Sequence, residues 1–577
     1  MSQSNYDKNP LISIKGFENE IFTAAGIRTE LAQRMNLDKN IVVVDCYPGV
    51  SLSSLEELFH DLSFDLVFCS DDCAYEPEKL DDLWEENLTD DRVFGIMTHG
   101  TLEQCFYPEK LQQLRTAIDA LPSGNVLLYG VGAALVTTGT LCILAELSRW
   151  EIQLRYRAGM DNWRTAKKDL PTLSKYKRGY FIEWRLADRH KRGLYSSIDY
   201  YLDMNQNAYP VMVTQNAYFF ALEQTSQRPF RLVPYFDPGI WGGNWMEKNF
   251  DLPSDCLNYA WSFDGVPEEN SLKFDFGSAI LETPAINLVF THPKELLGDR
   301  VHARFGTEFP IRFDFLDTMG GQNLSLQVHP LTEYIQEHFH MHYTQDESYY
   351  IMDAGENACV YLGVKEGVNK EEMMDNLVAA QNGSELFRDE DFINRFPVKK
   401  HDHVLIPAGT IHCSGKNTVV LEISATPYIF TFKLWDWNRL GLDGLPRPVH
   451  LAHGFANIQW NRDTSWVRQE LLHQETVVYE AQNILIERTG LHNREFIDTY
   501  RLNFSVPVPV QPNGSVHMLN LVEGTEITVH SANNTFADFV VHYGETFIVP
   551  EAAGAYKLFP SPDSADTSRV ILACVRN

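Results

Sequence analysis

The chain has 577 residues, of which 44% are hydrophobic and 12% aromatic, and its formal net charge at pH 7 is -30. A single hydrophobic core stops growing near roughly 250–300 residues, so this length predicts about three domains. The acidic excess repels nucleic acid and anionic lipid at long range, which favours a small molecule or a protein as the partner.

Targeting signals and cysteines bear on the compartment. The first twenty residues contain no basic-then-apolar leader, and no stretch approaches about 18 uninterrupted apolar residues. Nine cysteines are scattered without a CxxC pair, which is typical of thiols in a reducing compartment. We therefore expect a cytoplasmic protein that is not bound to a membrane.

Residues 1–227 alternate short apolar runs with amphipathic helical patterns. IVVVDCYPG, DLVFCSDD and NVLLYGVGAAL are such runs, and this alternation predicts an α/β domain with a mostly parallel sheet. The stretch Arg149–Arg192 holds thirteen Lys or Arg against five Asp or Glu. Arginine forks match phosphate oxygens, so the stretch is either an anion site or a solvated or acid-paired face.

By its layout this domain resembles a nucleoside-kinase-type phosphotransferase, which implies a lid-like segment carrying Arg185, Arg189 and Arg192. The stretch YGVGAALVTTGT has glycines after a strand but no Gly-Lys-Ser/Thr to hold a triphosphate and its magnesium. We therefore expect no kinase activity from residues 1–227, and a regulatory or scaffolding role instead.

Beyond residue 228 short strands with Gly, Pro, Asn and Asp turns replace the helical patterns, which predicts a β-sandwich or barrel. A faint internal repeat divides this part into lobes at 228–465 and 466–577. HDHVLIPAGTIHC and YGETFIVPEAAGAY match when Pro407 is laid on Pro550, and Ala555 then stands where the first lobe has His412. Whatever His412 does is therefore expected in one lobe only.

Four residues of the first lobe form a candidate metal site. Gln327 and His329 alternate on one strand and share a face, which either faces water or points at a common ion. With Glu347 and His412 they make a mixed nitrogen and oxygen set suited to a divalent metal such as zinc, with a position open for water or substrate. Each residue also has an ordinary structural interpretation when it is taken alone.

Six motifs resemble those of class I (cupin-type) mannose-6-phosphate isomerases. They are PYFDPGIWGGNWM, QVHP, ESYYIMDA, YLGVKEGV, IPAGTIH and LWDWNRLGLDGLPRPVH. The resemblance implies a double-lobed cupin (jelly-roll) fold with one zinc ion per chain, held by Gln327, His329, Glu347 and His412. It also implies the interconversion of mannose 6-phosphate and fructose 6-phosphate through an enediol.

The same resemblance implies that Arg439 stabilises charge near the reacting carbons and that Ser325 lies near the substrate phosphate. An arginine after a Trp-Asp-Trp run can equally be a structural ion-pair partner of Asp436, and this alternative stays open. At three positions the chain departs from the family: Gln345 and Leu445 stand where lysines are usual, and Leu331 stands where an aspartate is usual.

The missing lysines keep two other functions in view. One is a non-catalytic sugar-phosphate-binding metal cupin whose α/β domain is regulatory. The other is a metal cupin oxygenase, which Gln327 disfavours because such sites use several histidines with one carboxylate. Two histidine clusters, EHFHMHY and KHDHV, match no family ligand position and are expected to be solvated or hydrogen-bonded loop residues.

Overall fold

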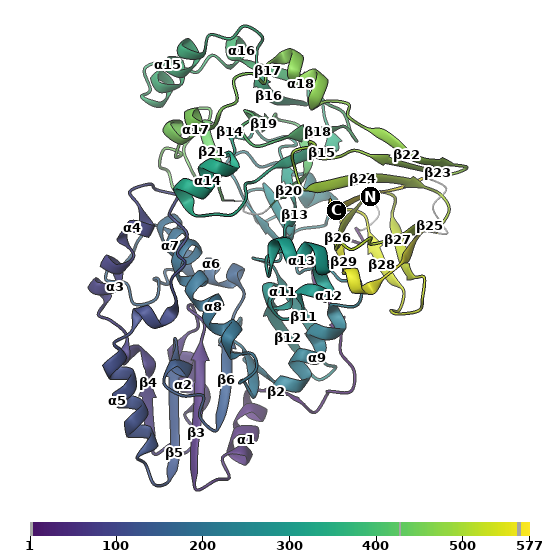
Figure 1. Cartoon of the computed structure of the whole chain (residues 1–577). Coiled ribbons are helices and arrows are strands. Elements are labelled where there is room, and N and C mark those ends of the chain that lie inside the picture. Colours follow the sequence, from purple (N-terminus) through teal and green to yellow (C-terminus); the bar gives the residue numbers. More distant parts are fainter. Residues whose placement is uncertain (1–3, 426–428, 562–566, 577) are drawn as a thin grey trace. The chain divides into compact units, whose positions relative to one another are not determined.

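The computed structural model describes residues 4–425, 429–561 and 567–576 (Figure 1). The chain folds into two compact units. Several sheets build its β-rich part, and the expectation of a multidomain chain with such a part is confirmed. No helix among the described residues is both long and apolar enough to cross a bilayer.

The two units exchange segments along the chain. Unit 2 consists of Leu11–Thr225 and Ser271–Thr291. Unit 1 takes the described residues up to Pro10, Ser226–Asn270, and the described residues from His292 onward. The predicted division into 1–227, 228–465 and 466–577 does not include this exchange.

Unit 2 is built on a seven-stranded sheet with the strand order β2-β8-β7-β6-β3-β5-β4. The pairings from β4 through β5, β3 and β6 to β7 are parallel, whereas β8 pairs antiparallel with both β7 and β2. The strands are β2 (Ile21–Thr23), β3 (Lys39–Cys46), β4 (Leu66–Cys69), β5 (Gly124–Gly130), β6 (Leu141–Glu146), β7 (Tyr200–Asp203) and β8 (Val211–Thr214). A smaller sheet in the order β1-β11-β12 contains β1 (Ile12–Ser13), β11 (Ser271–Asp275) and β12 (Ile280–Pro284).

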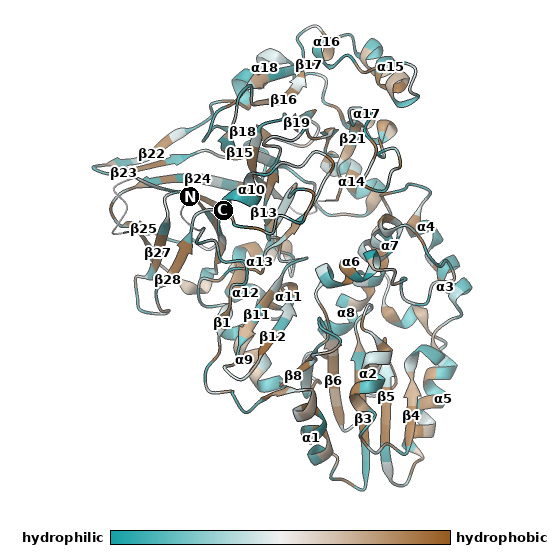
Figure 2. Cartoon of the chain, turned by 180° about the vertical axis from the view of Figure 1, so that it is seen from behind, coloured by the Kyte–Doolittle hydropathy of each residue, from teal (hydrophilic) through white to brown (hydrophobic). Residues whose placement is uncertain are grey.

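The sequence of β3, KNIVVVDC, explains its central place in the sheet. A nearly continuous apolar run suits a strand that is covered on both faces, and every residue from Asn40 to Cys46 is buried. Figure 2 shows the strands of this sheet as hydrophobic. Ile41 and Val43 of β3 pack with Val126 and Leu128 of β5 in one core.

Helices of unit 2 connect these strands. They are α1 (Ala24–Arg34), α2 (Leu52–Phe59), α3 (Pro77–Leu83), α4 (Glu85–Leu88), α5 (Pro108–Asp119), α6 (Arg149–Arg157), α7 (Thr172–Arg178), α8 (Trp184–Leu194), α9 (Gln215–Thr225) and α11 (Ile286–Thr291). Ser148 caps α6 by accepting a hydrogen bond from the Glu151 amide. Pro108 is the first residue of α5, a position whose backbone amide has no acceptor within the helix, so the missing N–H of proline costs nothing.

The first lobe of unit 1 pairs a six-stranded sheet with a five-stranded one. The six-stranded sheet runs β18 (His403–Ile406), β15 (Glu347–Ala354), β20 (Thr418–Ala425), β13 (Ile311–Asp317), β10 (Trp261–Gly265) and β9 (Tyr235–Asp237). The five-stranded sheet runs β17 (Ile393–Pro397), β16 (Cys359–Val364), β19 (His412–Ser414), β14 (Leu326–Val328) and β21 (Phe432–Trp435). Among the described residues, neighbouring strands in these two sheets pair antiparallel.

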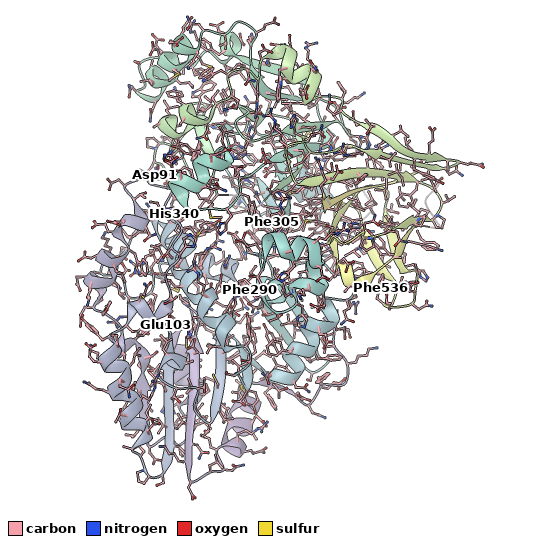
Figure 3. The ribbon with its side chains drawn as sticks, viewed as in Figure 1. Asp91, Glu103, Phe290, Phe305, His340 and Phe536 are labelled. Carbon is pink, nitrogen blue, oxygen red and sulfur yellow. The ribbon has the colours of Figure 1, made fainter. Side chains whose placement is uncertain are left out.

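Helices of unit 1 lie between these strands in the chain. They are α10 (Trp245–Asn249), α12 (Pro293–Leu297), α13 (Asp299–Phe305), α14 (Thr332–Phe339), α15 (Lys370–Gln381), α16 (Asp389–Phe392), α17 (Leu451–Asn457) and α18 (Thr464–Glu470). Phe305 at the end of α13 (Figure 3) lies 5.4 Å from the ring of Tyr343 and 4.8 Å from that of Phe496. This aromatic group joins α13 to the segments that precede β15 and β24.

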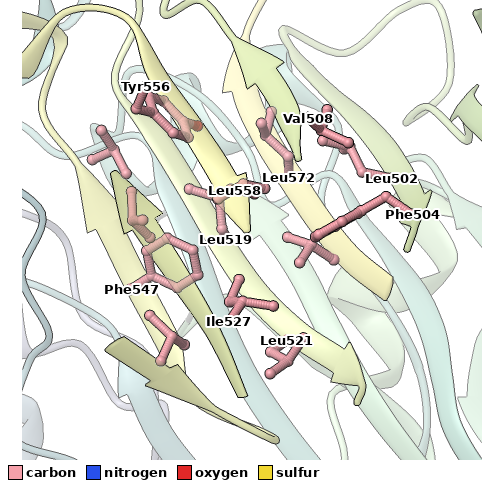
Figure 4. Close-up of a cluster of buried hydrophobic side chains, with 14 of the residues drawn as sticks. Leu502, Phe504, Val508, Leu519, Leu521, Ile527, Phe547, Tyr556, Leu558 and Leu572 are labelled. Atoms are coloured by element: carbon pink, nitrogen blue, oxygen red, sulfur yellow. The ribbon is translucent and has the colours of Figure 1, made fainter. Parts of the chain in front are cut away.

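The second lobe repeats the two-sheet plan. One sheet runs β22 (Thr476–Ala481), β23 (Ile484–Arg488), β24 (Ile497–Phe504), β31 (Ser568–Val575), β26 (His517–Glu523) and β29 (Thr546–Val549). The other runs β25 (Val508–Val510), β30 (Tyr556–Pro560), β27 (Glu526–Ser531) and β28 (Phe539–His542). Side chains of both sheets, among them Leu519, Phe547 and Leu558, form one buried core (Figure 4).

Candidate metal centre

Two sheets of the first lobe bring the predicted ligands together. Gln327 of β14 stands directly opposite His412 of β19 in the five-stranded sheet, so their side chains share a face. His329 follows the end of β14 before Pro330, and Glu347 begins β15 in the six-stranded sheet. The site therefore takes residues from both layers of the lobe.

The ligand atoms lie close enough to hold one ion. Nε2 of His329 is 3.1 Å from Oε2 of Glu347, and Nε2 of His412 is 2.8 Å from Oε1 of the same carboxylate. The ligand atoms of these three residues all fall within 4.8 Å of one another, and all three residues are buried. The side-chain amide of Gln327 adds a polar atom 3.2 Å from Nε2 of His412, and a half-turn of the amide exchanges its nitrogen for its oxygen there.

Backbone carbonyls orient both imidazoles. Nδ1 of His329 is 3.1 Å from the carbonyl oxygen of Phe430, and Nδ1 of His412 is 2.9 Å from that of Thr410. An imidazole that donates its Nδ1 proton keeps the Nε2 lone pair available for a metal. Both lone pairs then point toward the Glu347 carboxylate, so the three residues fit a divalent cation.

Electrostatics around Glu347 also favour a cation. Asp314, Glu347 and Glu422 are all buried, and Arg312 pairs with Asp314 at 3.2 Å and with Glu422 at 3.1 Å. Burial raises the pKa of Glu422 well above its usual range, and the neighbouring Asp314 and Glu347 raise it further. Burial opposes ionisation of Glu347 too, but His329 and His412 outweigh it and lower the pKa of that carboxyl. A cation bound beside Glu347 would offset the cost of burying the negative charge of that carboxylate.

Ser325 lies two residues before Gln327 and is 1% exposed. Within the described part of the chain its hydroxyl has no hydrogen-bond partner. A buried hydroxyl without a partner costs free energy unless a ligand or water satisfies it. The position predicted to meet the substrate therefore has an unused donor.

Arg439 is engaged with its own loop and with the segment that precedes β14. Its Nε donates to Oδ1 of Asp436 at 3.1 Å, its Nη1 donates to the carbonyl of Asn323 at 2.7 Å, and its Nη2 also contacts Asp436. Arg447 binds the other oxygen of Asp436 at 2.7 Å. The ion pair with Asp436 that the sequence left open is present, and it fixes the guanidinium in position.

Sequence reasoning missed Lys433. This residue of β21 stands opposite Gln327, so the two side chains share a face of the sheet. It also helps to keep Asp436 ionised: burial raises the pKa of Asp436, but Arg447, Lys433 and Arg439 together lower it. Lys433 supplies a positive charge beside the candidate site. Gln345 and Leu445, which stand where lysines were expected, supply none. Only the pairing of β14 with β21 reveals this, because Lys433 belongs to none of the recognised motifs.

Gln345 occupies one of the positions where a lysine was expected. Its Nε2 donates to Oε2 of Glu347 at 2.9 Å and lies 3.2 Å from Oε1 of Glu422. Its amide therefore orients the candidate ligand carboxylate instead of carrying a charge. Leu445, at the other lysine position, is 48% exposed.

The histidine clusters lie outside the candidate centre. His338 belongs to α14 and stacks on Tyr334 at 3.9 Å, so the expectation of a loop residue is wrong for this histidine. His401 is 2.9 Å from Glu523, and buried His403 is 2.8 Å from the hydroxyl of Ser348. Burial first, and then nearby Arg501, lower the pKa of His403 to about 3.

The basic stretch of unit 2 is directed at unit 2 itself. Arg189 donates to the carbonyls of Gly100 and Thr98 at 2.6 and 2.5 Å, Arg185 donates to that of Tyr180 at 2.9 Å, and Arg192 lies over the ring of Phe290. These contacts stabilise the fold. Each of the three arginines therefore has at least one contact within unit 2.

Comparison with known proteins assigns the two regions separately. A family model described as "Domain of unknown function (DUF8485)" matches residues 25–227. Mannose-6-phosphate isomerase of Streptococcus mutans is 24% identical over 336 residues, which cover 57% of this chain and 94% of that protein. ManA of Bacillus subtilis, also a mannose-6-phosphate isomerase, is 24% identical over 333 residues, covering 57% of this chain and 95% of that protein. The chain is a relative of the mannose-6-phosphate isomerases.

The predicted resemblance to class I mannose-6-phosphate isomerases is confirmed by these relatives. Among solved structures, the B. subtilis mannose 6-phosphate isomerase is 21% identical, with a TM-score of 0.48 and coverage of 60% of this chain and 99% of its own. A phosphomannose isomerase from Salmonella typhimurium is 14% identical, with a TM-score of 0.46 and coverage of 61% and 100%.

Proposed function

We propose that the chain interconverts mannose 6-phosphate and fructose 6-phosphate at the first lobe of unit 1, with one zinc ion bound by Gln327, His329, Glu347 and His412. The buried group of His329, Glu347 and His412 is the observation that carries the proposal. The isomerase relatives supply the substrate class and support an enzyme. Nine cysteines, all free in the structure, favour a cytoplasmic location.

The reaction sets the demands on the site. When mannose 6-phosphate becomes fructose 6-phosphate, a proton leaves C2, a proton is added at C1, and the hydroxyl hydrogen passes from O2 to O1 through an enediol. A divalent cation at such a site withdraws electron density from the sugar oxygens and lowers the barrier to proton removal. The surrounding side chains must bind the phosphate and stabilise developing negative charge.

Three side chains of the first lobe suit these tasks. The Ser325 hydroxyl is buried without a protein partner and can donate to a phosphate oxygen. Arg439 is held by Asp436 and carries a fixed positive charge, and Lys433 adds a second charge on the face of Gln327. Fixed charges cost no reorganisation during the reaction, so they act mainly on the transition state.

The test is an assay of the full chain for fructose 6-phosphate formation, before and after metal removal by a chelator. We expect activity to vanish on chelation and to return with Zn²⁺. A metal-replete, folded chain that binds mannose 6-phosphate without turnover would instead support the non-catalytic sugar-phosphate-binding protein with a regulatory α/β unit. The absence of both binding and turnover would refute the proposal.

A further inference from the structure

The second lobe carries a counterpart of the first-lobe centre, as the strand pairings reveal. In the first lobe Glu347 stands opposite Ile406, which precedes Pro407. In the second lobe His517 stands opposite Val549, which precedes Pro550. Because these prolines occupy matching places in the internal repeat, His517 takes the position of Glu347.

The other ligand positions have changed as well. Gln511 precedes Pro512 as His329 precedes Pro330, and Ala555 stands at the position of His412. Among the described residues of this lobe, no His, Cys, Asp and Glu side chains cluster closely enough to hold a metal. The second lobe has therefore lost the metal chemistry of this position.

A cavity of about 430 Å³ remains at this place, lined by His517, Gln511 and Pro512 together with residues of β23, β24 and β31. Small-molecule sites fall in the range of roughly 300–1,000 Å³. Tyr500 of β24 and Cys574 of β31 line the cavity and are only partly buried, although they pack against the core of this lobe. The core is thus left unfilled at one end.

The wall combines an apolar floor with polar groups. Ile486, Leu502 and Leu572 supply the floor. Asp498 accepts hydrogen bonds from Nε of Arg488 at 2.8 Å and from the Tyr500 hydroxyl at 3.2 Å. Such a wall suits a ligand with one apolar face and several hydroxyl groups.

Asp498 and Arg576 are the Asp, Glu, Lys or Arg side chains of the lining. Arg576 lies 3.8 Å from Asp498 and donates to the backbone carbonyls of Asn493 and Ile497. His517 is hydrogen-bonded at Nδ1 to the Tyr556 hydroxyl at 2.8 Å, and burial, partly opposed by a hydrogen bond with the Pro512 carbonyl, lowers its pKa to about 4. The imidazole is then neutral at pH 7 and adds no positive charge for a dianionic phosphate.

We propose that this cavity is a metal-free binding site for a neutral sugar, a hexose or a disaccharide without phosphate. The site is separate from the first-lobe centre and does not depend on isomerase activity. Its Tyr500 ring, prolines and leucines would pack on the apolar face of the sugar ring, and Asp498, Gln511 and His517 would meet its hydroxyl groups.

Ligand-observed NMR and calorimetry on the full chain test the site, with D-mannose, mannobiose and inorganic phosphate as probes. We expect at least one sugar to bind and phosphate not to compete with it. Gln511→Trp places a large side chain at an exposed position of the mouth and should weaken sugar binding by about tenfold or more, whereas the exposed-loop control Asn533→Trp should not. His412→Ala, which removes a first-lobe ligand, should leave sugar binding unchanged.

Several outcomes would overturn the site. They are no binding by either sugar, binding that survives Gln511→Trp, binding that His412→Ala abolishes, and phosphate binding that Gln511→Trp abolishes. If Gln511→Trp fails to fold by its thermal midpoint, Tyr500→Leu, which removes the half-buried ring, takes its place with the same expected loss.

Discussion

At the scale of single residues, we expect His412 to decide whether the first lobe holds a metal. The purified chain should contain about one divalent ion, because the second lobe has Ala555 at the matching position. His412→Ala removes a buried Nε2 ligand and should empty the site by elemental analysis. The matched control is His338→Ala, which changes an exposed histidine of α14 and should leave the metal content unaltered. Two ions per chain, or one that persists in the double variant His412→Ala with Gln327→Ala, would contradict the assignment.

Arg439 should act in the transition state more than in substrate binding. Arg439→Lys keeps the charge but loses the fork that grips Asp436 and the Asn323 carbonyl. We expect kcat to fall at least about tenfold while KM changes little. Arg388→Lys, at an exposed arginine that also pairs with two carboxylates, is the control. A raised KM with unchanged kcat would show that Arg439 binds the substrate and the transition state equally well.

Asp264 makes the stability of unit 1 sensitive to pH. Burial raises its pKa to about 7, although Arg231 and hydrogen bonds from Thr546 oppose the rise. The folded pKa lies above the usual value of 3.8, so the contribution to stability is complete below about pH 4 and is lost as the pH rises toward 7.

The pH dependence of the thermal midpoint measures this effect. Asp264→Asn cannot ionise, so its stability should fall less than that of the parent chain between pH 4 and 7. The slopes of stability against pH should differ by the equivalent of up to about one proton. Asp538→Asn, at a side chain that is 62% exposed, should keep the parent slope. Equal slopes in parent and Asp264→Asn would show that Asp264 stays ionised in the fold.

At the scale of elements, the turn after β5 argues against nucleotide binding. Gly130 and Gly132 adopt positive φ angles, but only a single 3₁₀ turn, Ala133–Leu135, follows them. The amide of Ala134 donates to Oδ2 of Asp45 at 2.8 Å. In a phosphate-binding turn such an amide would instead donate to a phosphate oxygen of the ligand. Titration of ATP with magnesium into the full chain should give no binding at unit 2, and micromolar affinity together with phosphoryl transfer would refute this.

Strand periodicity accounts for what the sequence predicted at the candidate centre. Two-residue spacing puts Ser325, Gln327 and His329 on one face, and this local rule holds without knowledge of the partners. The acids Asp314 and Glu422 could not be foreseen, because only the register of β13 with β20 sets them opposite each other. His338 was expected in a loop but lies on α14, because Ile335 and Phe339, spaced four residues apart, bury one face of a helix.

At the scale of the whole molecule, the segment exchange changes what a truncation does. Deleting residues 1–227 would remove β1, the partner of β11, and Glu146 and Tyr218, which hydrogen-bond Asn287. It would also take from unit 1 the ring of Tyr6, which stacks on Phe250 at 4.2 Å. We expect this truncation to be aggregation-prone, with a lower thermal midpoint than a deletion of 11–225 together with 271–291 that retains the first ten residues. Equal midpoints would show that the exchanged segments contribute little.

The order of synthesis gives the exchange a further consequence. A chain leaves the ribosome from its N-terminus, so the long part of unit 2 ends at Thr225 but its last strands and helix arrive only with Thr291. The delay is 291 - 225 = 66 residues, or about 3–13 s at typical translation rates. During that interval Glu146 and Tyr218 have not yet met Asn287. Tyr6 waits far longer for the ring of Phe250, and the amide of Asp7 for the carboxylate of Glu545 that accepts its hydrogen bond. The nascent protein must therefore avoid aggregation while both units are incomplete. Neither unit can finish folding before synthesis of the other has started.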